Sequence, residues 1–557
     1  MNLHHQIFQN NRAELPYQVF RARLIFMAGI FVVAFVIVSV RLADFGLWAV
    51  DQDLSVRIKT PKVMQSRPNI VDRNGKLLAT DIQTASLFAD PRKVNDIDEA
   101  AELLVPILKD MSAVDLRKIL AKQKRSFVWV KRELSPRQES AIHNLGIAGL
   151  GFVRENRRVY PTGSAAAHIL GHVDLDNKGI AGIEKYIDRS VKANTVGGPA
   201  PEHKPVELAV DLRVQHGLRD ELVGAVKQYQ AKAAAGVILD VATGEVVAMS
   251  SLPDYNPNKP KTALDKTRIN RMVAGVYELG STFKVITIAM ALDMGVANMS
   301  TKFDAREPLR YGKFTISDFH AQKRFLSVPE IFVHSSNIGS ARMAMAVGIG
   351  RHKAFLKSLG LLDRLSTELP ENARPLYPKN WKELNTMTIA FGHGLSVAPL
   401  QLAAAGAALV NGGLYIPPTF LKRDPIDAIQ LARRVVKRKT SAQIREMMAL
   451  NVNEGTAKRA HVPGMRVGGK TGTAEKVVNG RYSKSALLTS FLGIFPTDAP
   501  RYVVLIMLDE PKPSEATRGF ATSGWNAVPL AGKVIKRVAP LLGILPKPVK
   551  SALVKTP

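Results

Sequence analysis

The chain has 557 residues, enough for more than one domain, and its 46% of hydrophobic and 22% of charged residues are ordinary for a folded protein. It contains no cysteine, which excludes disulfide bonds, thiol catalysis and cysteine-based metal sites. The formal net charge of +29 favours anionic surfaces of any kind. Because no basic run with interleaved aromatic residues accompanies that charge, we expect no nucleic acid partner.

An apolar run near the N-terminus predicts a membrane anchor. Residues 24–41 begin with the uncharged sequence LIFMAGIFVVAFVIVSV, which as a helix spans about 26 Å and just crosses the hydrocarbon core of a bilayer. Arg21, Arg23 and Arg41 can reach the two interfaces from its ends. Acidic residues follow the run, so the positive-inside rule places residues 1–23 in the cytoplasm and everything after the anchor outside it.

Two other interpretations of this run remain open. A cleaved signal peptide would have a shorter apolar core and small residues at its cleavage site, whereas residues 40–43 read VRLA. A buried core helix could have this length, but the flanking arginines disfavour it. We therefore expect a single uncleaved anchor, with most of the basic chain facing anionic lipid head groups and an anionic cell wall.

Residues 42–205 show a mixed, strand-rich pattern that predicts a separate domain. Within it, residues 67–79 predict two strands joined by a turn at Asn74-Gly75. No catalytic grouping of side chains stands out in this part of the chain. A link rich in glycine and proline, residues 197–201, precedes the next domain.

Residues 206–543 predict an α+β domain in which one antiparallel sheet is covered by helices. A helical pattern fills the middle of the segment, and strand patterns stand at both of its ends. The Asn479-Gly480 pair predicts a tight hairpin between two late strands. The predicted strands are residues 235–240, 245–250, 470–478, 487–495 and 502–508. The remaining residues, 544–557, are basic and contain proline, which predicts a loose tail.

The sequence Gly280-Ser281-Thr282-Phe283-Lys284 leads into an apolar run that predicts a buried helix. Ser281 would lie in the first turn, where free N–H groups and the helix dipole favour negative charge. Lys284 follows three residues later on the same face, so its amine can reach the Ser281 hydroxyl. The lysine can activate this serine only if it is neutral, which requires burial and a second cation to lower its pKa.

Two further short motifs follow in the same domain. Ser335-Ser336-Asn337 comes at the end of a predicted helix, and Lys470-Thr471-Gly472-Thr473 opens the first late strand. A single short motif arises easily by chance, but the order and spacing of all three make the set specific.

Together these residues have the chemistry that acyl transfer needs. Ser281 would be the nucleophile and Lys284 its proton acceptor. Lys470 would keep Lys284 neutral by repulsion and would attract a substrate carboxylate. Ser335 could pass a proton to a leaving amine, and Asn337 could hydrogen-bond a substrate amide.

The rest of the third motif is predicted to bind the substrate. Gly472 lacks a side chain, so a substrate backbone can lie against the strand edge. Thr471 and Thr473 offer hydroxyl groups to a carboxylate. The backbone N–H groups of Ser281 and Thr473 would form an oxyanion hole.

Each of these residues also has a purely structural interpretation. Ser281 could simply cap a helix, Asn337 could be a turn residue and Gly472 could mark a β-bulge. All three would have to coincide, which favours the catalytic interpretation. His393, in the sequence FGHG, has no carboxylate or second histidine at ligand spacing, so we expect it to be structural.

The three motifs in this order resemble the signature of penicillin-binding proteins and serine β-lactamases. Further segments resemble class B penicillin-binding proteins and extend the likeness from the anchor to about residue 541: RPNIVDRNG, RVYPTG with HILG, GIAGIE, DLRVQ, SLPDYNPN and FGHGLSVAPLQ. The asparagine at position 337 is most similar to the division-specific, septum-building branch of that class.

This resemblance implies a transmembrane anchor (24–41), a class B pedestal domain (42–205) and a penicillin-binding transpeptidase domain (206–543). It implies a D,D-transpeptidase of the inner membrane whose catalytic domain is periplasmic. The enzyme would acylate Ser281 with a peptidoglycan stem peptide, release the terminal D-alanine and pass the acyl group to a neighbouring amine. No metal or cofactor is expected. The implied partners are stem peptides or their lipid-linked precursor, β-lactam antibiotics, a membrane glycosyltransferase and other division proteins.

Two functions of other classes remain open. A membrane-anchored serine β-lactamase or penicillin sensor shares the site, and the sequence STFK itself occurs in some β-lactamases, which rarely carry a large pedestal. A non-catalytic division scaffold would keep the fold and lose the motifs. The lifetime of a penicillin acyl-enzyme would distinguish the three functions.

Overall fold

The computed structural model of the protein describes residues 14–47, 66–194 and 204–546. The link predicted at residues 197–201 and most of the predicted tail lie outside the described residues. The chain divides into two compact units, which comprise residues 1–65 with 85–155, and residues 66–84 with 156–557.

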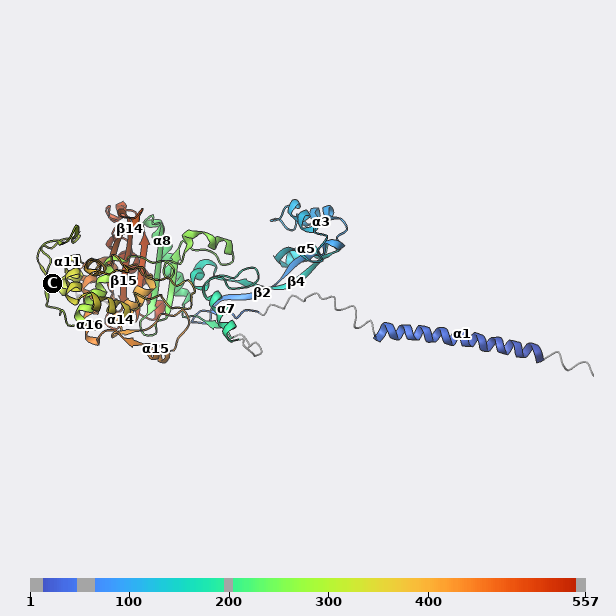
Figure 1. Ribbon diagram of the computed structural model, residues 1–557. Helices are drawn as coiled ribbons and strands as arrows, with labels where there is room; N and C mark the ends of the chain where they lie inside the picture. Colours follow the sequence, from blue (N-terminus) through green and yellow to red (C-terminus); the bar gives the residue numbers. More distant parts are fainter. Residues whose placement is uncertain (1–13, 48–65, 195–203, 547–557) are drawn as a thin grey trace, which may run out of the picture. The chain divides into compact units, whose positions relative to one another are not determined.

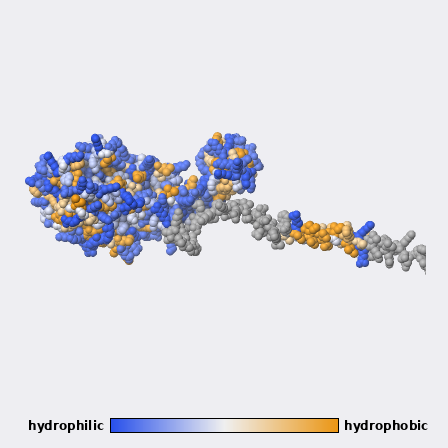
Figure 2. Space-filling model, viewed as in Figure 1, coloured by the Kyte–Doolittle hydropathy of each residue, from blue (hydrophilic) through white to orange (hydrophobic). Residues whose placement is uncertain are grey.

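The first described element is a long helix, α1 (Glu14–Leu47) (Figure 1). Its segment Phe20–Ala43 has a mean hydropathy of 2.6, and none of its side chains is buried, so it forms an apolar rod in Figure 2. A helix of this length and composition can cross a bilayer. It contains the predicted anchor at residues 24–41.

The unit of residues 85–155 packs short helices against strands. Strand β3 (Val128–Leu134) pairs antiparallel with the second half of β2 (Leu77–Ala89). Leu87 of β2 meets Leu104 and Leu116 of two helices in a buried apolar core. This part of the predicted strand-rich domain therefore contains helix as well as strand. Its helices, each with a side-chain cap at its N-terminus, are α3 (Ile97–Leu104), α4 (Ala113–Leu120) and α5 (Pro136–His143).

The hairpin predicted at residues 67–79 is present in the second unit. Strand β1 (Ile70–Val71) pairs antiparallel with the start of β2, and Gly75 takes the turn with φ of 77°, a conformation that glycine adopts freely. The Asp72 carboxylate accepts hydrogen bonds from the backbone N–H groups two and four residues later, both at 2.8 Å. Strand β5 (Val206–Glu207) then pairs in parallel with β1.

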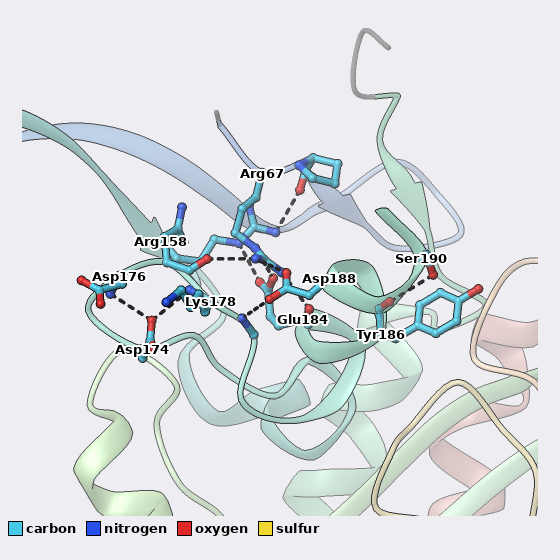
Figure 3. Close-up of polar contacts among 12 residues, drawn as sticks. Arg67, Arg158, Asp174, Asp176, Lys178, Glu184, Tyr186, Asp188 and Ser190 are labelled. Carbon is cyan, nitrogen blue, oxygen red and sulfur yellow. Dashed lines mark hydrogen bonds and ion pairs between the residues drawn. The ribbon is translucent and has the colours of Figure 1, made fainter. Parts of the chain in front are cut away.

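Charged side chains from segments far apart in the sequence meet in a buried ion cluster (Figure 3). Arg158 is fully buried and donates to Glu184 at 2.6 Å and to Asp81 at 3.1 Å. Arg67 donates to Glu184 at 2.9 Å and also to Asp188. Because every charge in the cluster has a counter-charge, removing one partner would leave another charge buried and unpaired. The segments RPNIVDRNG, RVYPTG and GIAGIE therefore meet in a cluster that holds this unit together.

The larger unit is built on one five-stranded sheet (Figure 1), as the sequence predicts. Its order is β14-β15-β16-β6-β7, and every neighbouring pair is antiparallel. The predicted Asn479-Gly480 turn joins β14 to β15, and its two residues have φ of 51° and 77°. The strands are β6 (Ala233–Asp240), β7 (Val246–Leu252), β14 (Gly468–Val478), β15 (Arg481–Phe495) and β16 (Tyr502–Asp509).

Helices cover both faces of this sheet. On one face, helices α8 (Leu212–Gln228) and α17 (Ala527–Val538) pack against side chains such as Ile506 of β16. On the other face, helix α14 (Pro399–Val410) packs against Leu505 and its alternate neighbours. Because β16 is buried on both faces, its sequence is an unbroken apolar run instead of an alternating one.

Candidate active site

The serine of the first motif lies in a tight turn that leads into a buried helix. Gly280–Phe283 forms a 3-10 turn, and helix α9 (Lys284–Asp293) starts directly after it. The sequence predicts Ser281 in the first turn of that helix, and the structure places it in the preceding 3-10 turn instead. The Ser281 side chain caps neither element, so its hydroxyl remains available for other contacts.

Lys284 lies at the centre of the three motifs. Its side chain is fully buried, and its Nζ lies 2.8 Å from Ser281 Oγ. The same Nζ lies 2.6 Å from the backbone oxygen of Ser335, 3.0 Å from Ser335 Oγ and 2.7 Å from Asn337 Oδ1. The first two predicted motifs therefore meet at this amine.

The electrostatics of the site favour a neutral Lys284. Burial lowers its pKa well below the ordinary value, the positive charge of Lys470 lowers it further, and Asp318 opposes both effects. A neutral amine has two N–H groups and one lone pair. It can donate to Ser335 O and Asn337 Oδ1 while its lone pair accepts the proton of the Ser281 hydroxyl, which is the arrangement that activates a serine.

The second motif is held between two helices. Helix α10 (Val328–Val333) ends just before Ser335, and helix α11 (Asn337–Val347) begins just after it. Ser335 adopts φ of 59°, a left-handed conformation that is strained for a residue other than glycine. In this backbone conformation, both the carbonyl oxygen and the hydroxyl of Ser335 contact Lys284 Nζ. Asn337 Nδ2 donates to the backbone oxygen of Ser317 at 2.9 Å, so both ends of its amide have protein partners.

Asp318 is a site residue that the sequence analysis missed. Its carboxylate accepts hydrogen bonds from Ser336 Oγ at 2.7 Å and from the backbone N–H groups of Asn337 and Ile338 at 2.5 and 3.0 Å. A carboxylate at the first turn of a helix is favoured by the free N–H groups and by the helix dipole. Because Asp318 belongs to no motif and lies on a loop, only the folded chain reveals it.

The third motif brings a second buried lysine to the same point. Lys470 on β14 is fully buried, and its Nζ lies 2.9 Å from Ser335 Oγ. Burial lowers its pKa to about 7. The Ser335 hydroxyl therefore bridges the two lysines, because Lys284 contacts it from the other side. Among the described residues, neither lysine forms an ion pair with a carboxylate.

Two glycines let the serine turn approach the edge of β14. A Cβ on Gly472 would lie 2.4 Å from the backbone oxygen of Leu279, and a Cβ on Gly280 would lie 2.7 Å from the backbone oxygen of Thr473. Gly280 also has φ of 55°. Neither position can hold a side chain without movement of the backbone, so the spacing between Ser281 and β14 depends on these glycines.

The two threonines of this motif have protein partners on their side chains. Thr471 Oγ1 lies 2.9 Å from Thr456 Oγ1, and Thr473 Oγ1 accepts from the backbone N–H of Ser523 at 3.1 Å. Their predicted role in binding a substrate carboxylate stays a prediction. Both lie on the edge strand of the sheet, where the edge of β14 opposite β15 has no strand partner among the described residues.

The loop that carries His393 also lies at the site. A Cβ on Gly392 would lie 2.0 Å from the backbone oxygen of Gly280, so this loop packs directly on the serine turn. Glu278 accepts from the Gly394 N–H at 2.8 Å and from the Tyr482 hydroxyl at 3.2 Å. Burial lowers the pKa of His393 to about 4. The histidine therefore stays neutral near pH 7 and packs beside the serine turn.

The site as a whole has the groups that acyl transfer requires. It presents a serine hydroxyl, a buried amine that can accept its proton, and a second hydroxyl bridged to a second amine. In the part of the chain that the structure describes, no cluster of three histidine or acidic side chains is arranged to hold a metal ion.

Two known protein domains match successive parts of the chain. The penicillin binding protein transpeptidase domain matches residues 234–529, and the penicillin-binding protein dimerisation domain matches residues 62–195. The chain belongs to the penicillin-binding protein family. All three motifs lie inside the first match.

Curated relatives of this family are similar over most of their length. The chain is 44% identical over 488 residues to "Probable peptidoglycan D,D-transpeptidase FtsI" of Caulobacter vibrioides, covering 86% of this chain and 82% of the relative. It is 29% identical over 520 residues to peptidoglycan D,D-transpeptidase FtsI of Escherichia coli K12, covering 88% and 86%. It is also 30% identical over 571 residues to stage V sporulation protein D of Bacillus subtilis, covering 95% and 87%.

A solved structure shares the fold. Penicillin binding protein 3 from Mycobacterium tuberculosis, complexed with aztreonam, matches with a TM-score of 0.66 at 23% identity, covering 87% of this chain and 97% of that chain. The predicted fold class is thereby confirmed: an N-terminal apolar helix, a pedestal domain of the dimerisation type, and a transpeptidase domain with a sheet flanked by helices.

Proposed function

We propose that this protein is a peptidoglycan D,D-transpeptidase that cross-links stem peptides during septal wall synthesis. The observation that carries the proposal is the position of Lys284 Nζ, 2.8 Å from Ser281 Oγ in a fully buried setting that lowers its pKa. The names of two similar curated relatives support the same activity.

In the first half of the reaction, Ser281 Oγ attacks the carbonyl carbon between the two terminal D-alanines of a stem peptide. The hydroxyl proton passes to Lys284 Nζ as the C–O bond forms. The C–N bond then breaks as Ser335 Oγ donates a proton to the departing amine and takes a proton from Lys284 Nζ, 3.0 Å away. The backbone N–H groups of Ser281 and Thr473 stabilise the oxyanion.

In the second half, the amine of a neighbouring stem attacks the ester carbonyl of the acyl-enzyme. Lys284 takes a proton from that amine as the new C–N bond forms. The ester C–O bond then breaks, and Ser281 recovers its proton. The net result is one new peptide bond and one free D-alanine.

The third motif binds the donor peptide. Thr471 and Thr473 present hydroxyls to the terminal carboxylate, and Lys470 supplies the attractive charge. The edge of β14 opposite β15 has no strand partner among the described residues, so the donor backbone can add to the sheet there as an extra strand. Asn337 orients a substrate amide once the donor displaces one of its protein contacts.

The proposed setting is the inner membrane, with residues 24–41 as the anchor, residues 42–205 as the pedestal, residues 206–543 as the periplasmic catalytic domain and residues 544–557 as a tail. A membrane glycosyltransferase and other division proteins would supply and position the glycan strands. The orientation can be tested cleanly because the chain has no cysteine. A membrane-impermeant maleimide should label Ser300→Cys but not Asn10→Cys in intact spheroplasts, and the reverse pattern would contradict the orientation.

The activity is tested by incubating membranes with a fluorescent penicillin and following the labelled band for hours. We expect a stable band in the wild type and none in Ser281→Ala, because Ser281 Oγ is the proposed nucleophile and Lys284 Nζ, 2.8 Å away, is its proton acceptor. Ser300→Ala, on an exposed loop, is the matched control and should label normally. Circular dichroism of each variant shows whether the fold is retained.

Other outcomes favour the other functions. A band that forms and decays within seconds would indicate a β-lactamase, whose acyl-enzyme is hydrolysed quickly. No band in the wild type would favour a non-catalytic scaffold. Labelling that persists in Ser281→Ala would refute the assignment of the nucleophile.

A further inference from the structure

A second small-molecule site is suggested by a hollow in the transpeptidase domain, on the outer face of helix α16 (Arg438–Asn453). The hollow has a volume of about 390 Å³, within the range of about 300–1,000 Å³ typical of small-molecule sites. One wall is the helical stripe that contains Arg445 and Ala449, and the other wall contains Arg466, Thr497 and Asp498. None of these residues belongs to the three motifs.

Two polar groups of the lining lack a partner. Thr497 is 4% exposed, and its Oγ1 is buried without a hydrogen bond. The Nε of Arg445 is likewise buried without a hydrogen bond, while its Nη1 makes only a long contact of 3.4 Å to the backbone oxygen of Asp498. A buried donor without a partner is destabilising, so an acceptor that enters the hollow and reaches these atoms would relieve that penalty.

The charges of the hollow indicate what kind of acceptor fits. Arg445 and Arg466 bring two guanidinium groups, and a guanidinium together with a hydroxyl matches the geometry of a carboxylate. Arg466 Nη1 lies 3.9 Å from the Asp498 carboxylate, a long contact in which the arginine side chain is 67% exposed; the same carboxylate accepts from the Ala499 N–H at 3.2 Å. Glu446 adds a second acidic group to the lining. The hollow therefore offers both signs of charge.

We propose that this hollow binds a free amino acid, whose carboxylate contacts Arg445 and Thr497 and whose ammonium group faces the acidic side chains Glu446 and Asp498. The ligand is small and zwitterionic, which suits a hollow that is lined by both signs of charge and by small side chains such as Ala449. Only the choice of D-alanine as the first probe rests on the proposed function, because D-alanine is the product that function releases.

The hollow lies next to the start of β14, the strand that carries the third motif. The methyl group of Thr497 would lie 2.6 Å from a Cβ on Gly468, so Thr497 packs against the start of β14. Gly468 stands two residues before Lys470. On the opposite side of α16, Asn451 Nδ2 donates to the backbone oxygen of Gly469 at 2.8 Å. An amino acid in the hollow thus borders the strand that carries the third motif.

The test is a saturation-transfer NMR titration of the full-length protein in detergent micelles with D-alanine. The protein is first acylated with penicillin, so that Ser281 is occupied. We expect saturable binding that weakens at least about tenfold in Arg445→Gln and in Thr497→Val, because each variant removes one donor to a charged group. Thr497→Val keeps the methyl contact with Gly468. Arg438→Gln, an equal charge change on the same helix but outside the hollow, should bind normally.

Two further probes resolve the chemistry of the ligand. Acetate should bind more weakly than D-alanine, because it lacks the ammonium group. Inorganic phosphate should not compete at equal concentration. Tighter binding of phosphate than of D-alanine, or an affinity that Arg445→Gln and Thr497→Val leave unchanged, would overturn the proposal, as would the absence of saturable binding.

The result of the amino-acid titration does not depend on the result of the test of the proposed function. If penicillin does not acylate the protein, the proposed function fails, and the titration is made on Ser281→Ala, where the arginine and threonine variants still decide whether the hollow binds the probe. Loss of D-alanine binding in Arg445→Gln and Thr497→Val supports the proposed amino-acid site whether or not penicillin acylates the protein.

Discussion

Replacing Asp318 by asparagine tests whether this carboxylate positions the second motif and opposes the neutral state of Lys284. The change keeps the shape of the side chain and removes its charge. Asp318 accepts from Ser336 Oγ and from two backbone N–H groups at the start of helix α11, at distances of 2.5–3.0 Å. All three contacts fix the backbone that presents Ser335 and Asn337 to the lysine.

The expected magnitude follows from those contacts. Hydrogen bonds to a charged group contribute about 1.5–3 kcal/mol, against about 1 kcal/mol for neutral ones. An asparagine oxygen can still accept from the two N–H groups, but each bond becomes a neutral one. We expect the hydrogen bonds that hold this loop to stabilise it by about 1–3 kcal/mol less than in the wild type. We expect acylation to slow by about tenfold to a hundredfold near neutral pH, because a displacement of about 1 Å in a catalytic group is enough to reduce the rate by that factor.

The pH dependence gives a result that a merely structural role would not produce. Acylation requires neutral Lys284, so its rate rises with pH through the pKa of that amine. Asp318 raises this pKa, and Asp318→Asn should therefore lower it further. The acid limb of the pH–rate profile should move to lower pH, even though the maximum rate falls.

The assay is the second-order rate of labelling by a fluorescent penicillin between about pH 5 and pH 9. Asp304→Asn is the matched control, because Asp304 makes an exposed pair with Arg306 and does not contact the motifs. That variant should keep both the rate and the profile. An acid limb that stays in place or moves to higher pH in Asp318→Asn would refute the reasoning.

Two further predictions concern other buried charges. Lys470→Ala removes a positive charge that lowers the pKa of Lys284, so its acid limb should move to higher pH, opposite to Asp318→Asn, with acylation at pH 7 slower by about tenfold or more. An unchanged profile would contradict this electrostatic role of Lys470. Glu184→Gln leaves the buried Arg158 and Arg67 with fewer counter-charges and should lower the free energy of unfolding in urea by about 3–5 kcal/mol. Glu207→Gln, which breaks only the exposed pair with Lys422, should change it by less than about 1 kcal/mol, and equal effects of the two variants would refute the burial argument.

Much of the fold could be predicted because it depends on local patterns. The apolar run at residues 24–41 predicts the spanning helix, since length and hydropathy are properties of the sequence alone. The Asn479-Gly480 pair predicts the β14–β15 turn, because both residues tolerate the positive φ that the turn needs. The strands β6 and β16 follow from short apolar runs that are buried on both faces of the sheet.

The three motifs could also be found in the sequence, because each is contiguous in the chain. Ser281 and Lys284 stand three residues apart, and the order of the three motifs is specific. The expectation that burial and Lys470 lower the pKa of Lys284 agrees with the site, where burial has the larger effect. The sequence nevertheless placed Ser281 in the first turn of the helix, whereas it lies in the 3-10 turn three residues before Lys284, because the apolar pattern does not distinguish a 3-10 turn from the first turn of an α-helix.

Contacts between distant segments required the tertiary structure. Nothing in the local sequence around Asp318 marks it as a partner of the second motif, and nothing marks Glu278 as a partner of Tyr482. The same holds for the ion cluster of Arg67, Arg158 and Glu184. Such pairs are fixed by the packing of elements that lie far apart in the chain, and no local periodicity encodes them.

The sequence by itself therefore determined the apolar N-terminal helix and the class of the two domains, and its three short motifs indicated the serine that we propose as the nucleophile. Only the tertiary structure decided how Lys284 is desolvated, which hydroxyl bridges it to Lys470, and which carboxylate opposes its neutral state. The physical reason is that burial and charge interactions depend on distances through space, which the chain sets only when all its elements are packed.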